Sequence, residues 1–298
     1  MESSKIEVGG ARPSTFSIVA RDPQGGEWGV AVQSKFLCVG SVVPWARADA
    51  GAVATQAWAN VGFGPAALEL LRGGTPAREV VDRLIAEDAG RDHRQLGVVD
   101  GRGTSAAWTG RLCFPWAGHR GGPEYTCQGN ILAGEAVVAA MEEAFVRSSG
   151  PLAERLVGVL HAGQAAGGDS RGQQSAALLV VKEKGGYGGF TDRAIDLRVD
   201  DHPTPIAELE RLLRLHRLYF APGMAGLTRA AGAVAREMQK ILAKLGYYQG
   251  PVSGEYDAAT QDAFRRFCHV ENFEERYRED EFVDRDVLTF MRERYGGV

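Results

Sequence analysis

Near the start of the chain, apolar and polar residues alternate at the beginning of a short segment, Thr15–Asp22. Thr15 and Ser17 alternate with Phe16 and Ile18, and a period of two is typical of a β-strand. Residues 22–26 contain one proline and two glycines, which favour a tight turn. Because Gly29–Ser34 has the composition of a second strand, the pattern predicts a β-hairpin.

This hairpin brings a hydroxyl group close to an amine. A turn centred between Gln24 and Gly25 places Thr15 opposite Ser34, with Lys35 beside it. A one-residue bulge would place Lys35 itself opposite Thr15, and the pattern does not decide between the two registers. In either register, the hydroxyl at the start of the first strand meets the amine at the end of the second.

Further along the chain, groups of strands alternate with pairs of helices. This order predicts two sheets packed face to face with helices outside, and it does not suit an alternating βαβ fold. The predicted segments after the hairpin are a strand at 51–56, helices at 65–72 and 75–87, strands at 96–100, 104–109, 113–118 and 125–128, helices at 134–147 and 151–162, and a strand at 173–182.

The end of the chain has a different, purely helical pattern. Proline and glycine in 219–226 predict the end of a helix and a boundary between domains. Beyond it, apolar residues at helical spacing predict a helix that ends at Gly246, and two more helices follow. We therefore divide the chain into a tail or cleavable pro-segment at 1–13, a sandwich domain at 14–220, a linker at 221–229 and a small three-helix domain at 230–298.

Composition and charge limit the class of protein to which this chain can belong. The 298 residues are 44% hydrophobic, enough for a full core, and the net charge of −4 argues against a nucleic-acid partner. Runs of about 18 apolar residues, the length that spans a bilayer, do not occur, and the first residues lack the apolar stretch of a secretory signal. The sequence thus predicts a cytoplasmic protein without a membrane partner.

The residue types that bind metals are poorly placed. The four cysteines are far apart and are predicted to be reduced thiols, so neither a zinc site nor a disulfide framework is expected. Asp200, Asp201 and His202 are consecutive, and adjacent strand residues point to opposite faces. We predict no metal site and no cofactor.

Thr15 is a candidate nucleophile. A hydroxyl becomes nucleophilic when a base accepts its proton, and cleavage between Ser14 and Thr15 would free an α-amine with a reference pKa of about 7.7–8.0. The positive charge of Lys35 would lower that pKa. The alternative is that Thr15 is only a residue of high strand propensity, and without further information that alternative is favoured.

Seven segments carry a family resemblance, namely 15–22, 29–35, 42–48, 51–56, 129–130, 167–177 and 196–203. Together they resemble the bacterial and archaeal domain of unknown function family 1028, over roughly residues 15–217. The resemblance implies an α+β fold, the four-layer αββα sandwich of the N-terminal nucleophile (Ntn) hydrolases, with Thr15 at the nucleophile position. In shorter relatives the equivalent threonine closely follows the initiator methionine, so here an N-terminal Thr15 requires endoproteolysis.

Polar residues between the predicted elements are the candidates for a supporting role. The resemblance favours an oxyanion hole at Asn130, with Gly129 letting the backbone approach a ligand; the alternative is a simple turn. Asp169 and Ser175, with Ser34, are predicted to orient the nucleophile. The alternative for Asp169 is an ion pair with Arg171.

Other polar residues are candidates for substrate binding. Thr55, Gln56 and Asn60 lie at a strand end, where sandwich enzymes place substrate contacts, although they could equally close a turn. Arg171 belongs to a glycine-rich loop, and His119 is the histidine in a predicted loop. We include both as candidates.

The end of the chain has a resemblance of its own. Residues 234–267 resemble a small peptidoglycan-binding domain of three helices, which implies that 230–298 binds peptidoglycan fragments. A stability or oligomerisation module is the alternative. We also expect the chain to form a homo-oligomer.

Two functions of different classes follow from these observations. The first is hydrolysis of a small amide or peptide-like substrate, with Thr15 as nucleophile, its α-amine as base, Lys35 tuning it and Asn130 near the oxyanion. The second is a non-catalytic protein that binds a ligand or cell-wall fragments in the same pocket and through its C-terminal module. A third possibility is that Lys35 directly activates an unprocessed Thr15, as in Ser–Lys hydrolases.

Overall fold

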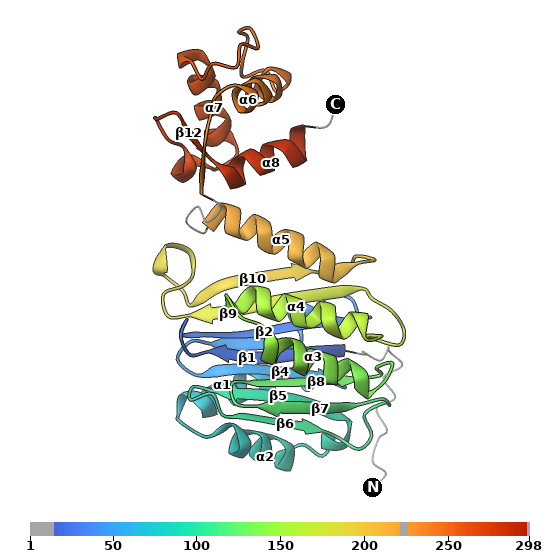
Figure 1. The fold of residues 1–298 in the computed structure, drawn as a ribbon. Helices are drawn as coiled ribbons and strands as arrows, with labels where there is room; N and C mark the ends of the chain where they lie inside the picture. Colours follow the sequence, from blue (N-terminus) through green and yellow to red (C-terminus); the bar gives the residue numbers. More distant parts are fainter. Residues whose placement is uncertain (1–14, 221–225, 297–298) are drawn as a thin grey trace. The chain divides into compact units, whose positions relative to one another are not determined.

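The computed structural model describes residues 15–220 and 226–296. Its contacts divide the chain into two compact units, Met1–Leu213 and Arg214–Val298. The first is an α+β unit built on antiparallel sheets, and the second is mainly helical, as predicted (Figure 1). Residues 1–13, the predicted tail or pro-segment, lie outside the described residues.

The predicted hairpin forms the centre of a six-stranded sheet. Strands β1 (Thr15–Asp22) and β2 (Glu27–Ser34) pair in a continuous register that places Thr15 opposite Ser34. The first of the two predicted registers is therefore correct. The strand order is β10-β9-β2-β1-β8-β7. The other strands are β7 (Gly118–Gly122), β8 (Tyr125–Asn130), β9 (Ser175–Lys182) and β10 (Arg193–Val199).

A four-stranded sheet lies against the inner face of the first. Val19, Val30 and Val32 of the six-stranded sheet share one buried cluster with Ala52 and Ala54 of the other. Residues 113–117, predicted as part of a strand, instead follow a turn in which the Cys113 N–H bonds the Gly110 carbonyl. The strands of this sheet, in spatial order, are β3 (Pro44–Arg47), β4 (Gly51–Ala57), β5 (Arg94–Asp100) and β6 (Ser105–Thr109).

Helices cover the outer faces of both sheets. The pair α3 (Glu135–Arg147) and α4 (Leu152–Ala165) packs on the six-stranded sheet. The pair α1 (Phe63–Arg72) and α2 (Ala77–Glu87) packs on the four-stranded sheet. Both helical pairs form where the sequence predicts them.

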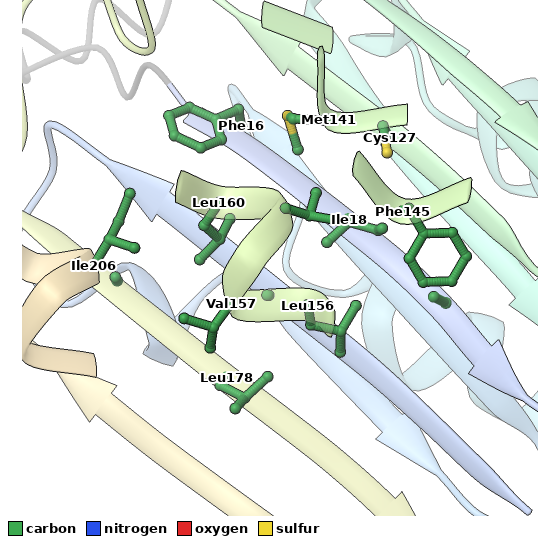
Figure 2. Close-up of a cluster of buried hydrophobic side chains, with 14 of the residues drawn as sticks. Phe16, Ile18, Cys127, Met141, Phe145, Leu156, Val157, Leu160, Leu178 and Ile206 are labelled. Atoms are coloured by element: carbon green, nitrogen blue, oxygen red, sulfur yellow. The ribbon is translucent and has the colours of Figure 1, made fainter. Parts of the chain in front are cut away.

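The alternation along β1 decides which side chains meet the helices. Phe16 and Ile18 are fully buried in the cluster that also contains Met141, Leu156 and Leu160 (Figure 2). Burying each such side chain contributes about 1.5–3 kcal/mol to the stability of the folded state. Because neighbouring strand residues point to opposite faces, this burial turns the hydroxyl groups of β1 toward the other sheet.

The second unit has its own aromatic core and a small two-stranded sheet. Asp257 caps the helix α7 (Ala258–Val270) by accepting the Thr260 N–H at 2.8 Å. The helix α5 (Pro205–Phe220) contributes Leu218 to this core, so the units divide after Leu213, whereas the sequence suggested 220. The remaining elements are β11 (Leu227–Arg229), α6 (Ala233–Lys244), α7 (Ala258–Val270), β12 (Phe282–Asp284) and α8 (Arg285–Tyr295).

The structure describes part of the segment 221–229, which the sequence predicts as a linker. Residues 221–225 lie outside the described residues, but Leu227–Arg229 form β11, which pairs with β12. Pairing with a strand that lies more than fifty residues further along the chain is not visible in local composition. Among the helices of the described residues, none has the length and apolar character needed to span a bilayer.

A glycine in α1 tests the packing of the four-stranded sheet. A Cβ at Gly64 would overlap the ring of Trp45, which is held in place by a hydrogen bond to the Val42 carbonyl at 3.0 Å. We expect Gly64→Ala to lower the free energy of unfolding by about 1–3 kcal/mol, as overpacking does. The control is Gly158→Ala in α4, where an added Cβ meets no atom within 4 Å. This substitution should raise the free energy of unfolding by about 0.5–1 kcal/mol. Urea unfolding measures both; equal effects would contradict the packing described.

Candidate functional site

Four polar residues form a row across one end of the six-stranded sheet. Asn130 pairs with Thr15, Thr15 with Ser34, and Ser34 with Ser175, on the neighbouring strands β8, β1, β2 and β9. Each of the four side chains is at most 1% exposed. The structure thus brings together four of the residues that the sequence predicts as catalytic.

Within this row, the hydroxyl groups of Thr15 and Ser34 are in direct contact. Their oxygen atoms, Oγ1 and Oγ, lie 3.2 Å apart, and both residues are fully buried. Ser175 faces other partners, since its Oγ donates to the Phe36 carbonyl at 2.5 Å and accepts the Val39 N–H at 3.1 Å. Ser34 is thus the neighbour of the Thr15 hydroxyl, and Ser175 fixes the segment that follows β2.

Asp169 is a buried carboxylate that holds the backbone at the end of β2. Its side chain accepts the N–H of Lys35 at 2.9 Å and the N–H of Arg171 at 2.9 Å. It also forms an ion pair with the Arg171 guanidinium at 3.3 Å, which is the predicted alternative for Asp169. The Lys35 ammonium bonds the Gln173 carbonyl at 3.2 Å, and its side chain is exposed. Lys35 is therefore held by its backbone beside the row, with its charge directed to Gln173.

A network of buried amides lies between the two sheets, directly under the row. The Ser17 hydroxyl donates to Gln56 Oε1 at 2.5 Å and accepts from Gln128 Nε2 at 2.6 Å. Gln56 Nε2 then donates to Gln95 Oε1 at 2.8 Å. Each of these residues is at most 1% exposed. The network joins the four-stranded sheet to β1 and β8 through polar contacts in a dry interior, where such bonds are strong.

Gln95 connects this network to Asn130. Its Oε1 accepts the Asn130 side-chain amide at 3.0 Å, and its Nε2 donates to the Gly129 carbonyl at 2.8 Å. The Asn130 side chain is thus oriented by a fixed partner beside Thr15. Ser17, Gln95 and Gln128 are not among the site residues predicted from the sequence. The available signal was a glutamine inside an otherwise apolar strand, because a buried polar group needs partners.

Two candidates for substrate binding, Thr55 and Asn60, make their contacts in the turn after β4. The Thr55 hydroxyl donates to the Asn60 carbonyl at 3.1 Å, and Asn60 Oδ1 accepts the Gly62 N–H at 3.1 Å. These contacts match the alternative in which Thr55 and Asn60 close a turn. Gln56, by contrast, points between the sheets into the amide network.

Two other candidates for substrate binding, Gly129 and His119, are in contact with other residues of the protein. A Cβ at Gly129 would overlap Leu132, so the space beside this glycine is occupied by protein. His119 lies on the exposed strand β7, with Nδ1 2.9 Å from the Thr109 hydroxyl. Desolvation of the ring, and then the charge of Arg78, lower the pKa of His119, which favours the neutral imidazole.

A small cavity adjoins Asn130 at the end of the sheets. Its volume is about 20 Å³, enough for roughly one water molecule. Trp58, Leu112 and Phe114 line it and keep 41%, 49% and 40% of their surface exposed. The cavity is thus far smaller than the roughly 300–1,000 Å³ of a typical small-molecule pocket.

Cys113 lines the same cavity but is a poor nucleophile. Burial raises the pKa of its thiol to about 11, and Sγ donates to the Arg94 carbonyl at 3.3 Å. Because the thiolate is the reactive form, this thiol is inert near neutral pH. The hydroxyl of Thr15 is therefore the better candidate at this end of the sheets.

The backbone is strained at two strand ends beside the cavity. Ala57 has φ 64°, immediately after Gln56, and Ile131 has φ 52°, immediately after Asn130. A left-handed conformation is costly for a residue with a Cβ, by about 1–3 kcal/mol. Ile131 is held there because its N–H bonds the Phe114 carbonyl at 3.0 Å. Such strain clusters at functional sites, so its position agrees with a site at Asn130.

Two buried glutamines test whether the amide network is a structural constraint. Gln56→Leu removes the acceptor of the Ser17 hydroxyl proton and one of the two donors to Gln95 Oε1. A buried donor left without a partner costs about 1–3 kcal/mol. We expect a clear fall in the free energy of unfolding, measured in urea. The matched control is Gln33→Leu, since Gln33 is fully buried but its amide has no partner among the described residues. That change should be neutral or stabilising, and equal losses in the two variants would contradict the constraint.

Comparison with known proteins agrees with the division into two units. Residues 15–209 match the model of a family described as "Family of unknown function (DUF1028)". Residues 227–291 match one described as "Putative peptidoglycan binding domain". A crystal structure of a DUF1028 protein from Silicibacter pomeroyi is similar to this chain, with a TM-score of 0.64 and 34% identity, over 70% of this chain and 91% of that one. A search of curated proteins gave no match.

Proposed function

The chain belongs to the DUF1028 family, and from this premise we propose that it is an amidohydrolase of the N-terminal nucleophile type. The substrate class is a small amide or peptide-like molecule. The observation that carries the proposal is the buried Thr15 hydroxyl at the start of β1, 3.2 Å from the Ser34 hydroxyl. Two facing sheets with helices outside support the four-layer αββα arrangement that this class uses.

In the proposed reaction, hydrolysis of the Ser14–Thr15 peptide bond by water first frees the α-amine of Thr15 and leaves a carboxylate on Ser14. Thr15 Oγ1 attacks the substrate carbonyl carbon while the α-amine takes the hydroxyl proton. The C–N bond then breaks, the leaving amine takes that proton, and an ester to Thr15 remains. Water attacks this ester with the α-amine again as base, which releases the carboxylic acid and restores Thr15.

Two neighbours of Thr15 have defined parts in this reaction. Ser34 bonds the hydroxyl and orients it toward the substrate. Asn130 is held by Gln95 at 3.0 Å, so a pre-oriented amide lies beside the nucleophile, where it would stabilise the oxyanion. Asp169 and Ser175 position the backbone of the segment after β2.

The position of Lys35 favours the processed form of the mechanism. A direct base must be within hydrogen-bond reach of the proton that it takes. The Lys35 ammonium instead bonds the Gln173 carbonyl at 3.2 Å, so the Ser–Lys alternative has no supporting contact among the residues that the structure describes. The part left to Lys35 is a long-range effect of its charge on the α-amine.

Binding of peptidoglycan fragments by the C-terminal module is the second candidate function. The specific observation in its favour is the family match at 227–291. In this reading, residues 230–298 bind cell-wall fragments, and the first unit binds a ligand without turnover. Cytoplasmic localisation and a homo-oligomeric state remain predictions.

Variants of Thr15 test the amidohydrolase directly. In a screen of small chromogenic amides, Thr15→Ala should abolish turnover, by a factor on the order of 10⁴ or more, because the nucleophile is lost. Thr15→Ser keeps a hydroxyl and should retain measurable activity. Iodoacetamide at pH 7.5 should leave turnover unchanged, since the raised pKa keeps Cys113 protonated. Turnover that survives in Thr15→Ala would refute the assignment.

A further inference from the structure

The second unit carries a groove of about 370 Å³ beside the turn after α6 and one side of α7. Tyr247, Asp262 and Arg266 line it with an aromatic ring, a carboxylate and a guanidinium. Glycines 246 and 250 and the exposed Ala259 also line it and contribute almost no side-chain bulk. The groove is therefore open to a ligand of moderate size that presents hydrogen-bonding groups.

The charged groups of the groove are held in place before a ligand binds. Arg266 Nε donates to Asp262 Oδ2 at 3.1 Å, and Arg266 Nη2 donates to the Tyr247 carbonyl. The guanidinium carbon lies 5.9 Å from the centre of the Tyr247 ring. The ring itself packs edge-on against Phe267, with centroids 6.2 Å apart. Groups fixed in this way lose little conformational entropy on binding.

Two glycines keep the groove open. Gly246 has φ 79°, a conformation that strains any residue with a Cβ. A Cβ at Gly250 would overlap the hydroxyl of Tyr248, which is buried and donates to the Pro251 carbonyl at 2.9 Å. A side chain is thus disfavoured at Gly246 by the backbone conformation and at Gly250 by the Tyr248 hydroxyl. A ligand can therefore approach the main chain at both glycines.

We propose that this groove binds the N-acetylated amino-sugar backbone of peptidoglycan, an inference that rests on the second proposed function. The one guanidinium that lines the groove, Arg266, already pairs with the one carboxylate there, Asp262, which Arg265 also contacts from outside the groove. Such a pair offers acceptors and donors to hydroxyl and acetamido groups, and the Tyr247 ring offers an apolar surface to a sugar. The carboxylates of a stem peptide would instead need an unpaired cation.

Titration of the full chain with two soluble probes tests this site. The probes are the tetramer of N-acetylglucosamine and a free stem pentapeptide, and isothermal calorimetry measures the dissociation constants. The wild type should bind the tetramer with little dependence on salt, since the ligand is neutral. Arg266→Gln should weaken that binding by about tenfold, the usual effect of losing one charge-assisted hydrogen bond. Ala259→Trp, at an exposed position, should block the groove.

The control variant is Arg265→Gln. Arg265 also pairs with Asp262, at 2.6 Å, but it does not line the groove, so its loss should change binding less than about twofold. If Arg266→Gln and Ala259→Trp bind the tetramer like the wild type, the groove is not the binding site, but the second proposed function still stands. If the wild type binds only the stem peptide, the sugar assignment is overturned. If it binds neither probe nor intact sacculi, the second proposed function itself fails.

Discussion

The register of β1 between β2 and β8 is the constraint on which the rest of the first unit depends. Phe16 and Ile18 enter the core under α3 and α4, and Thr15 and Ser17 therefore face the other sheet. A slip of one residue would exchange these two sets, exposing hydroxyl groups to the apolar core and moving Thr15 away from Ser34. Core packing and the candidate site are thus set by the same strand.

The amide network extends this constraint to the second sheet. Gln56 and Gln95 reach from β4 and β5 to the row that contains Thr15 and Asn130. Each such hydrogen bond adds only about 1 kcal/mol, but leaving a buried amide without a partner costs more. The network therefore favours a single relative position of the two sheets. The strained residues Ala57 and Ile131 directly follow Gln56 and Asn130 at the same end.

Local sequence patterns were sufficient for the hairpin and for part of the site. The position of the turn allowed two registers, and the one that pairs Thr15 with Ser34 is observed. The amide network was missed because its partners are distant in sequence, 39 residues for Ser17 and Gln56 and 111 for Ser17 and Gln128. Gly129 illustrates another limit, since residue type suggested room for a ligand where Leu132 is packed. Which residue fills a space is decided by tertiary packing.

The central claim is that Thr15 acts through its own α-amine. The measurement that tests it most directly is the intact mass and N-terminal sequence of the untagged protein, purified after expression of the chain as printed. The account predicts a polypeptide that begins at Thr15, with residues 1–14 removed. A protein that turns over amides while still carrying residues 2–14 would contradict it, because the proposed base would then be part of a peptide bond.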